Sequence, residues 1–553
     1  MSKTNEQSLG LILIILGTIA LYIYSATFPF LPLDDTDIIQ SKLPYLGDIT
    51  NLWDIFTTPL YKDLVTSLYR PLLYMTFMID TILGNQSPST FHISNTLFHL
   101  IAILLVFRLF LYFTATQKTA LLLTAIFALH PIHVHAVTWI SGRNDILLAI
   151  NLLLIIITYL TTLNSSKQRY LYFHFFFLFS SFFVKETAIV IPILLVIHAT
   201  LVNRDRQKLK MLGIGWVISS GLAILLRSFV VTTDYPLKFT GLLDSIQNFS
   251  IAFINYFGKL FIPYNYSVLP DIADMAILPG IVALTIFIIV TMVIKKRSRK
   301  LFWFGIVWYI LFITPTIVWS IFSRIGEYYE HRSYIPLIGI LISISQLKWG
   351  KISLVSSTAK LITLSCLVIL LLISSVDRLI RYRSPLSFVD SAVAESPSHA
   401  RSHSMRGHEY QNIGDYDTAV KEYISALEIN PYIPWVYNNY GQIKLNLGQT
   451  NESIELFTIA IKMNPKDGNA YFNRAIAYVI IKQLPLALDD FDNAINLEPE
   501  NADYYYNRGL ALESIGETEK ALADFEQAKV MLPDDELLIE KIFQIKSGRP
   551  NDE

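Results

Sequence analysis

The chain has 553 residues, enough for more than one domain. Charged residues make up only 16% of the chain and the mean hydropathy is +0.44, which excludes an ordinary soluble protein. The net charge is about +11 up to residue 390 and about −12 from residue 391 onward, and this acidic C-terminal part argues against nucleic acid as a partner.

Apolar stretches long enough to cross a bilayer recur through the first 376 residues. The first stretch follows Lys3 and carries no small-residue cleavage site, which indicates an uncleaved anchor. The segment 248–263 is interrupted by Asn255 and Lys259, so we expect an interfacial helix there. The expected spans, about eleven, are 9–28, 92–113, 118–138, 145–163, 170–184, 187–203, 211–231, 274–294, 301–321, 334–348 and 358–376.

Basic residues between these spans predict the orientation, because cytoplasmic loops are enriched in Lys and Arg. A cytoplasmic N-terminus and eleven spans place every basic loop inside, and the loop 29–91 and the C-terminal part outside. We therefore expect a multi-pass protein of the bacterial inner membrane or the endoplasmic reticulum. The basic loops contain Lys167 to Arg169, Arg204, Arg206, Lys208 and Lys210, Lys295 to Lys300, and Lys348 and Lys351.

The C-terminal part repeats with a step of 34 residues. Small residues keep the same step as a recurring proline and let paired helices approach closely. The pattern resembles the tetratricopeptide repeat, with four units over 397–532 and a capping helix with a tail over 533–553. Such an array typically binds a protein or peptide on its concave face, and a spacer is the alternative. The in-phase prolines are Pro397, Pro431, Pro465, Pro499 and Pro533.

Three carboxylates, Asp34, Asp35 and Asp37, follow the first span. Such a cluster at the end of a spanning helix is costly unless it faces water, a metal or a substrate. A carboxylate here can act as general base toward a hydroxyl, or hold a divalent cation such as Mg²⁺ or Mn²⁺ that neutralises a phosphate leaving group. The alternative is a solvated turn.

Further ionisable residues lie at the predicted outward ends of the spans. Arg and Lys side chains beside carboxylates suit a phosphate or pyrophosphate group. Anchoring at lipid head groups, local ion pairing and histidine packing are the alternatives, and the histidine spacing fits no closed zinc site. These candidates are Arg70, His92, Asn95, His99, His130, His133, His135, Arg143, Asn144, Asp145, Lys185, Glu186, Glu330, His331, Arg332 and Tyr334.

The order of these motifs, followed by the repeats, resembles the transmembrane and tetratricopeptide-repeat glycosyltransferases. These are relatives of the protein O-mannosyltransferases and have the GT-C fold. The residues that carry the resemblance are Asp34-Asp35, Tyr69-Arg70-Pro71-Leu72, His92 with Asn95 and His99, His130-Pro131-Ile132-His133, Gly142-Arg143-Asn144-Asp145, Lys185-Glu186-Thr187 and Glu330-His331-Arg332-Ser333-Tyr334-Ile335-Pro336.

The resemblance implies inverting transfer of a sugar from a polyprenyl-phosphate donor to an acceptor outside the cytoplasm, usually a protein hydroxyl. Asp35 or Asp34 would be the base, and the lipid tail would enter from the bilayer. The repeats would bind the acceptor or a partner protein. The phosphate-binding candidates are Arg70, Arg143, Lys185, His331 and Arg332.

The expected fold is all-α, a polytopic GT-C-like helix bundle followed by a tetratricopeptide-repeat solenoid. The domains are 1–380 in the membrane, a linker 381–396, repeats 397–532 and a cap 533–553. A non-enzymatic scaffold whose repeats recruit envelope proteins is the alternative function. A transferase that acts on lipid or envelope glycan is another.

Overall fold

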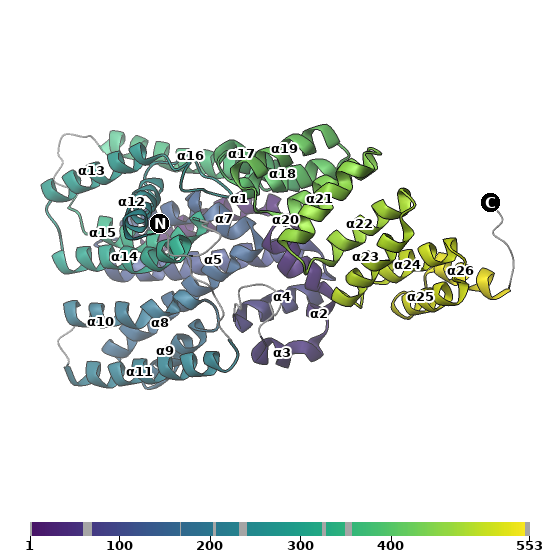
Figure 1. Ribbon diagram of the computed structural model, residues 1–553. Coiled ribbons are helices and arrows are strands. Elements are labelled where there is room, and N and C mark those ends of the chain that lie inside the picture. The colour runs from purple at the N-terminus through teal and green to yellow at the C-terminus, as the bar shows by residue number, and fades with distance from the viewer. Residues whose placement is uncertain are drawn as a thin grey trace. The chain divides into compact units, whose positions relative to one another are not determined.

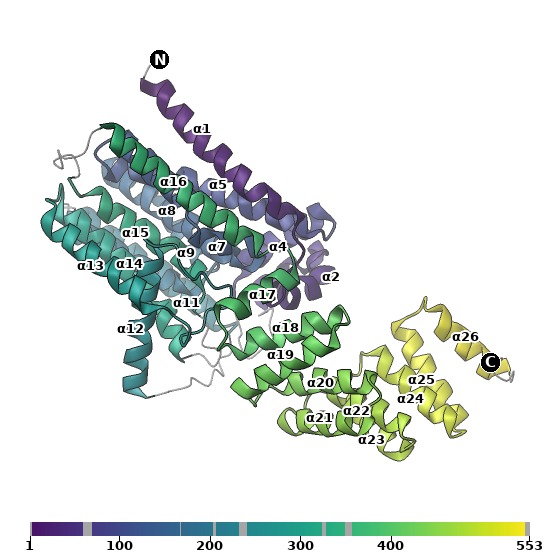
Figure 2. The ribbon, with the colours of Figure 1, turned by 90° about the horizontal axis from the view of Figure 1, so that it is seen from above.

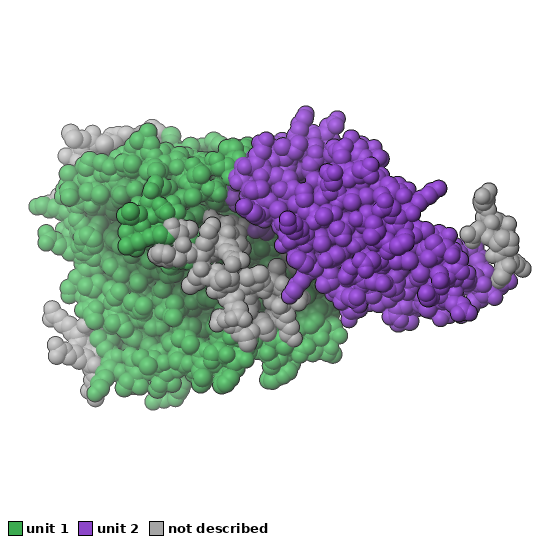
Figure 3. All heavy atoms as spheres, in the orientation of Figure 1, with its two compact units in different colours: residues 1–398 green, residues 399–553 purple. Residues whose placement is uncertain are grey.

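The chain divides into two compact units, residues 1–398 (unit 1) and 399–553 (unit 2), in this computed structural model (Figure 3). The structure describes residues 3–58, 69–165, 167–202, 206–231, 241–322, 328–348 and 357–547. The side chain of Asp37, the basic residues Arg204 and Lys351, and part of the loop 29–91 lie outside these described residues.

In its described part, unit 1 is built of helices joined by loops. No β-strand forms there, and one isolated bridge pairs Lys296 with Leu347 (Figures 1 and 2). Its α-helices are α1 (Lys3–Tyr22), α2 (Leu43–Leu46), α3 (Leu52–Thr57), α4 (Pro71–Gly84), α5 (Pro88–Phe113), α6 (Gln117–Leu129), α7 (Ile132–Thr138), α8 (Arg143–Asn164), α9 (Arg169–Ser181), α10 (Ile191–Val202), α11 (Arg206–Ser228), α12 (Leu242–Lys259), α13 (Ile277–Val293), α14 (Arg299–Phe322), α15 (Tyr334–Ser345), α16 (Ser357–Ile380) and α17 (Pro385–Glu395). Its short helical turns are η1 (Ile23–Thr27), η2 (Asp35–Ile39), η3 (Gln40–Lys42), η4 (Ile49–Asn51), η5 (Ile140–Gly142), η6 (Glu186–Val190) and η7 (Glu330–Ser333).

Within the described residues, five helices are long and apolar enough to cross a bilayer, and α6 with α7 adds a sixth if the bent pair is one span. The expected spans 170–184 and 334–348 correspond to α9 and α15, which have only 13 and 12 residues. At 1.5 Å per residue, helices of this length are shorter than the roughly 30 Å hydrocarbon core. The all-α polytopic fold is confirmed, whereas the count of eleven spans stays a prediction. The five helical segments are Ser8–Thr27, Pro88–Phe113, Ile140–Asn164, Leu209–Ser228 and Arg299–Phe322.

A bend of 61° separates α6 from α7, which together correspond to the span expected over 118–138. His130 precedes Pro131 and has an extended conformation, with φ −70° and ψ 127°. Proline disfavours helical geometry in the residue before it and lacks the N–H that a helix interior needs. The bend brings α7 against η7, which lies about 200 residues later in the chain.

Helices α14 and α15 approach each other unusually closely. A Cβ atom on Gly305 would lie 2.3 Å from the carbonyl oxygen of Gly339, and one on Gly339 would lie 2.6 Å from the carbonyl oxygen of Gly305. Glycine at both positions therefore permits backbone contact between the two helices. This contact holds the middle of α15 against α14, and α15 itself follows directly after η7.

Unit 2 consists of successive antiparallel helix pairs (Figures 1 and 2). Gly441 lies on α20 against the ring of Phe457 on α21, and Gly509 and Phe525 repeat this contact in a later pair. The small residue on the first helix leaves room for the aromatic ring of the second. The helices are α18 (Ala400–Asn412), α19 (Tyr416–Ile429), α20 (Pro434–Asn446), α21 (Thr450–Met463), α22 (Gly468–Ile480), α23 (Leu484–Leu497), α24 (Ala502–Ser514), α25 (Thr518–Met531) and α26 (Glu536–Ser547).

The turn inside each pair contains one residue with a positive φ. Gly414, Gly448 and Gly516 have φ values of 81°, 76° and 82°, and Lys482 adopts φ 60° at the same repeat position. Glycine is favoured in this left-handed geometry because it has no Cβ atom. The turn therefore keeps its shape in the third pair even though lysine replaces glycine.

Gly441→Val is expected to loosen the second helix pair, because a Cβ at this position would lie 2.6 Å from the Phe457 ring. Overpacking of this kind costs about 1–3 kcal/mol. Hydrogen exchange of the full-length protein should be faster in α20 and α21. Asn446→Val, at an exposed position on the same helix, is the control, and equal exchange rates in the two variants would contradict the packing described.

Candidate active site

Lys185 forms a buried ion pair at the start of α8. Its Nζ atom lies 2.6 and 2.7 Å from the two carboxylate oxygens of Asp145, and it donates to Oδ1 of Asn144 at 3.0 Å. Asp145 lies in the first turn of α8, where the helix dipole favours a negative charge. Burial lowers the pKa of Lys185 to about 8, and the Asp145 carboxylate opposes this decrease.

Asp35 lies at the start of η2 and is fully buried. Its Oδ1 accepts hydrogen bonds from the backbone N–H and the hydroxyl of Ser141, both at 3.1 Å. Its Oδ2 has no hydrogen-bond partner among the described residues. Burial raises the pKa of Asp35 to about 7, although the Ser141 hydrogen bonds lower it and the neighbouring Asp34 raises it further.

Asp35 and Lys185 belong to one hydrogen-bonded chain. The Ser141 carbonyl accepts from the side-chain amide of Asn144 at 2.9 Å, and the oxygen of that amide accepts from Lys185. Three residues predicted from separate motifs, Asp35, Asp145 and Lys185, are therefore brought together. Asp34 lies beside them but is less buried than Asp35.

A second group contains Arg70, Glu186 and Arg227. Glu186 lies 2.8 Å from Arg70 and 3.0 Å from Arg227, so two cations share one carboxylate and the group carries one excess positive charge. The side chain of Arg70 is 15% exposed, that of Glu186 is 35% exposed and that of Arg227 is 22% exposed. Besides its burial, the positive charges of Arg70 and Arg332 lower the pKa of Lys185.

Arg143 is predicted as a phosphate contact, but its side chain is fully buried inside unit 1. It forms an ion pair with Asp80 at 2.6 Å and donates to Asn95 Oδ1 at 2.5 Å and to Ser94 Oγ at 2.6 Å. Its guanidinium also lies over the Phe77 ring. This set of internal partners favours a structural role, because a buried guanidinium with all its neighbours paired offers little to a phosphate.

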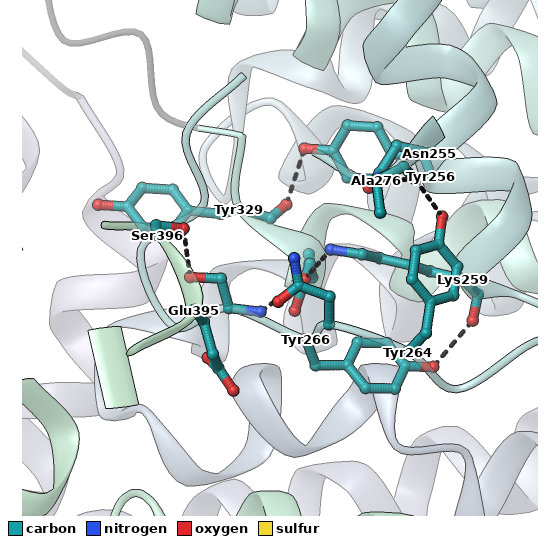
Figure 4. A network of polar contacts seen from close by, with 12 residues as sticks. Asn255, Tyr256, Lys259, Tyr264, Tyr266, Ala276, Tyr329, Glu395 and Ser396 are labelled. Atoms are coloured by element: carbon teal, nitrogen blue, oxygen red, sulfur yellow. Dashed lines mark hydrogen bonds and ion pairs between the residues drawn. The ribbon is translucent and has the colours of Figure 1, made fainter. Parts of the chain in front are cut away.

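Glu330 is a second carboxylate shared by two cations. It pairs with Lys259 of α12 and Arg378 of α16 and accepts from the backbone N–H of Ser267 at 3.1 Å. Figure 4 shows this region, where the Tyr256 hydroxyl donates to the Tyr329 carbonyl at 3.1 Å. These contacts hold η7 in place, which favours a structural role for Glu330. By fixing η7, they also orient the two residues that follow Glu330.

These next residues are His331 and Arg332. The Nε2 atom of His331 lies 3.5 Å from Asp145 Oδ2, so His331 joins the Lys185 pair. Arg332 donates to the Ser320 hydroxyl at 2.7 Å and its guanidinium lies over the Tyr329 ring. His331 therefore lies near Lys185 through their shared partner Asp145, as the predicted position of both at the outward ends of the spans suggests.

The remaining candidates pack elsewhere in the interior. His99 Nδ1 lies 2.6 Å from the Tyr334 hydroxyl, and the His133 ring packs 4.2 Å from the Tyr334 ring. His130 Nε2 contacts the Leu260 carbonyl at 3.2 Å, and His92 is buried beside Phe28. Across the described part of the chain, no three His, Cys, Asp or Glu side chains are arranged to hold a metal ion.

Sequence reasoning missed four charged partners, Asp80, Arg227, Lys259 and Arg378. Asp80, Arg227 and Lys259 are each a single charged residue in or at the end of an apolar stretch, and Arg378 follows Asp377 at the end of another. Such residues in membrane helices almost always pair inside the protein or mark a functional pathway. That signal was present for all four, but the sequence does not show which opposite charge each one meets.

Asp80→Asn should strongly destabilise unit 1, because it leaves the buried charge of Arg143 without its partner. Losing one member of a buried pair costs about 3–5 kcal/mol, so the midpoint temperature of thermal unfolding of the solubilised full-length protein should fall. Asp377→Asn, at a 67% exposed member of a pair, is the control. The double variant Asp80→Asn/Arg143→Gln should regain part of the loss, and an Asp80→Asn midpoint equal to that of the control would contradict the assignment.

Comparison with known proteins identifies the repeats of unit 2. Models described as tetratricopeptide repeat match residues 400–432 and 440–495, and one described as TPR repeat matches 477–516. Among solved structures, MamA is 25% identical with a TM-score of 0.26, covering 27% of this chain and 82% of that chain. YrrB, described as a TPR protein with an unusual peptide-binding site, is 26% identical with a TM-score of 0.26, covering 31% of this chain and 86% of that chain.

Curated relatives match a limited part of the chain. Protein O-mannosyl-transferase TMTC3 of Mus musculus is 33% identical over 109 residues, 19% of this chain and 11% of that protein. Protein O-mannosyl-transferase TMTC4 of Mus musculus is 34% identical over 158 residues, covering 25% and 20% of the two chains. Unit 2 is thus built of tetratricopeptide repeats, and the chain is similar to the TMTC protein O-mannosyl-transferases, which confirms the family resemblance expected from the sequence.

Proposed function

We propose that unit 1 is a membrane glycosyltransferase that moves a sugar from a polyprenyl-phosphate donor to a hydroxyl acceptor on the non-cytoplasmic face. The observation that carries the proposal is the buried Asp35, which has one unpaired oxygen and is linked through Ser141 and Asn144 to Lys185. A candidate base and one candidate phosphate-binding cation, Lys185, therefore belong to one hydrogen-bonded network.

Asp35 is suited to the role of general base. A base works best when its pKa lies near the operating pH, and burial raises the pKa of Asp35 to about 7. Oδ1 is held by Ser141, which leaves Oδ2 for the acceptor proton. The acceptor oxygen then attacks the anomeric carbon directly, so no covalent sugar–protein intermediate is needed and the configuration inverts.

The cations support departure of the phosphate. When the bond between the anomeric carbon and the phosphate oxygen breaks, the electron pair stays on that oxygen. Lys185, Arg332 and the Arg70–Glu186–Arg227 group provide positive charge around the position this oxygen would occupy. Preorganised charge of this kind is commonly the largest contribution to catalysis.

A divalent cation such as Mg²⁺ or Mn²⁺ is a further group that the carboxylates of this site could bind. Asp34 and Asp35 are the candidate ligands, but the described residues offer no third His, Cys, Asp or Glu to complete a site. Mg²⁺ is usually bound through one or two carboxylates together with substrate phosphates. The two aspartates would therefore hold such an ion together with the donor phosphate, whose charge it would neutralise.

The orientation expected from the loop charges places Asp35 and the repeats on the non-cytoplasmic side. The names of the relatives, protein O-mannosyl-transferases, favour mannose as the sugar and a protein hydroxyl as the acceptor. Repeats that bind the acceptor protein would raise its effective concentration at the reacting groups.

Asp35→Asn should lower the rate of sugar transfer at least about 10²-fold, because an amide cannot accept the acceptor proton. In the wild type, kcat/KM should fall as the pH drops below about 7, since protonation of Asp35 removes the base. Labelled polyprenyl-phosphate mannose and the purified full chain supply the assay. Asp54→Asn, at an exposed position of α3, is the control. A fully active Asp35→Asn variant would refute the assignment.

Arg227→Gln should weaken donor binding, because it leaves Arg70 and Glu186 as a neutral pair and removes the excess positive charge. The KM for the donor should rise about tenfold while kcat changes little, as expected for a hydrogen bond to a charged group. Arg108→Gln, at an exposed position of α5, serves for comparison. An unchanged KM would exclude Arg227 from donor binding.

A further inference from the structure

Four aromatic rings meet where α7 and the residue that follows it contact η7 and the residue that precedes it. His135 lies 4.6 Å from His331 and 5.0 Å from Trp139 between ring centroids. Tyr329 stacks on His331 at 5.3 Å, with an angle of 26° between the ring planes, and lies 5.4 Å from Trp139. These four residues are called the ring cluster below.

Three polar atoms of the ring cluster are buried without a hydrogen-bond partner among the described residues: Trp139 Nε1, His135 Nδ1 and His331 Nδ1. Their residues are 3%, 1% and 4% exposed, in that order. Buried polar groups in folded proteins are almost always hydrogen-bonded to protein, water or ligand. Three unpaired atoms in adjoining rings therefore indicate that something bound there completes their hydrogen bonds.

The polarity of these atoms narrows the class of ligand. The indole Nε1–H of Trp139 can only donate. Burial lowers the pKa of His331 well below its usual value, so the ring is neutral, and a proton on Nε2 toward Asp145 leaves Nδ1 as an acceptor. A hydroxyl group can accept a hydrogen bond from Trp139 Nε1–H and donate one to His331 Nδ1. A carboxylate or ionised phosphate can only accept, and an ammonium can only donate.

Aromatic faces beside hydroxyl-binding atoms suit a polyhydroxylated ring, whose C–H groups pack on aromatic carbon. We propose that the ring cluster is the subsite for the sugar of the donor. The inference rests on the proposed function, since it names where the transferred group is held.

The position of the ring cluster fits this role. Trp139 lies two residues before Ser141, whose backbone N–H and hydroxyl donate to Asp35. His331 lies 3.5 Å from Asp145, the partner of Lys185. A sugar on the ring cluster would therefore lie beside both the candidate base and the nearest candidate phosphate-binding cation.

The test compares how two kinds of lipid bind to the full chain in lipid nanodiscs. One is polyprenyl phosphate without a sugar, and the other is polyprenyl phosphate that carries mannose, glucose or galactose. The wild type should bind at least one sugar-linked lipid more tightly than the bare lipid. Trp139→Phe keeps an aromatic face and removes the N–H, so it should weaken binding of that lipid about tenfold. Its affinity for bare polyprenyl phosphate should be unchanged, which also reports that the variant is folded.

Trp53→Phe, at a tryptophan of α3 that is 74% exposed, is the matched control and should change neither affinity. The sugar subsite is overturned if no sugar-linked lipid binds better than the bare lipid. It is also overturned if Trp139→Phe changes both affinities equally or neither, since ordered water would then account for the unpaired atoms. Failure of the wild type to bind any of these lipids would instead contradict the proposed function.

Discussion

Charged side chains inside unit 1 lie against opposite charges from helices that are distant in sequence, and the arrangement of its helices depends on these pairs. An ionised group taken out of water is costly unless a partner and further hydrogen bonds compensate it. Arg143 of α8 meets Asp80 of α4, and Lys185 meets Asp145. Glu330 joins α12 and α16 through Lys259 and Arg378. Each pair fixes two or three helix ends relative to one another.

The same constraint explains why the candidate groups lie together. Charged residues at the ends of several helices take part in the polar contacts around the short helical turns. These helices are α8, α11, α12 and α16, and the turns are η2, η5, η6 and η7. Where Glu186 is shared by Arg70 and Arg227, the partly exposed group keeps an excess positive charge that an anionic substrate can neutralise. Asp35 differs from the paired carboxylates because no ion pair among the described residues includes it and its Oδ1 accepts from Ser141. Burial raises its pKa to about 7, although these hydrogen bonds oppose the increase.

Much of the fold could be predicted from periodicity. The step of 34 residues predicts the helix pairs of unit 2 because each turn and each small residue recurs at a fixed place. Apolar stretches predict the helices of unit 1, but composition does not fix their length, so α9 and α15 are shorter than expected. The bend at His130 follows from Pro131, a signal that the sequence contains and that hydropathy alone overlooks.

The candidate site could be predicted only in outline. The sequence predicts Asp35, Lys185 and His331 on the same side of the membrane, at one end of the helices. The structure brings these three residues together. Partner choice is a three-dimensional property, so the pairing of Arg143 with Asp80 instead of a ligand was not visible. The distinction between Asp34 and Asp35 likewise depends on burial, which two adjacent aspartates in a sequence do not reveal.

The most direct measurement of the central claim is sugar transfer by the purified full chain in liposomes that contain labelled polyprenyl-phosphate mannose and an acceptor protein. The account predicts label on acceptor hydroxyl groups, with the anomeric configuration inverted relative to the donor. Binding of the donor without any transfer to a hydroxyl group, or transfer with retained configuration, would contradict it.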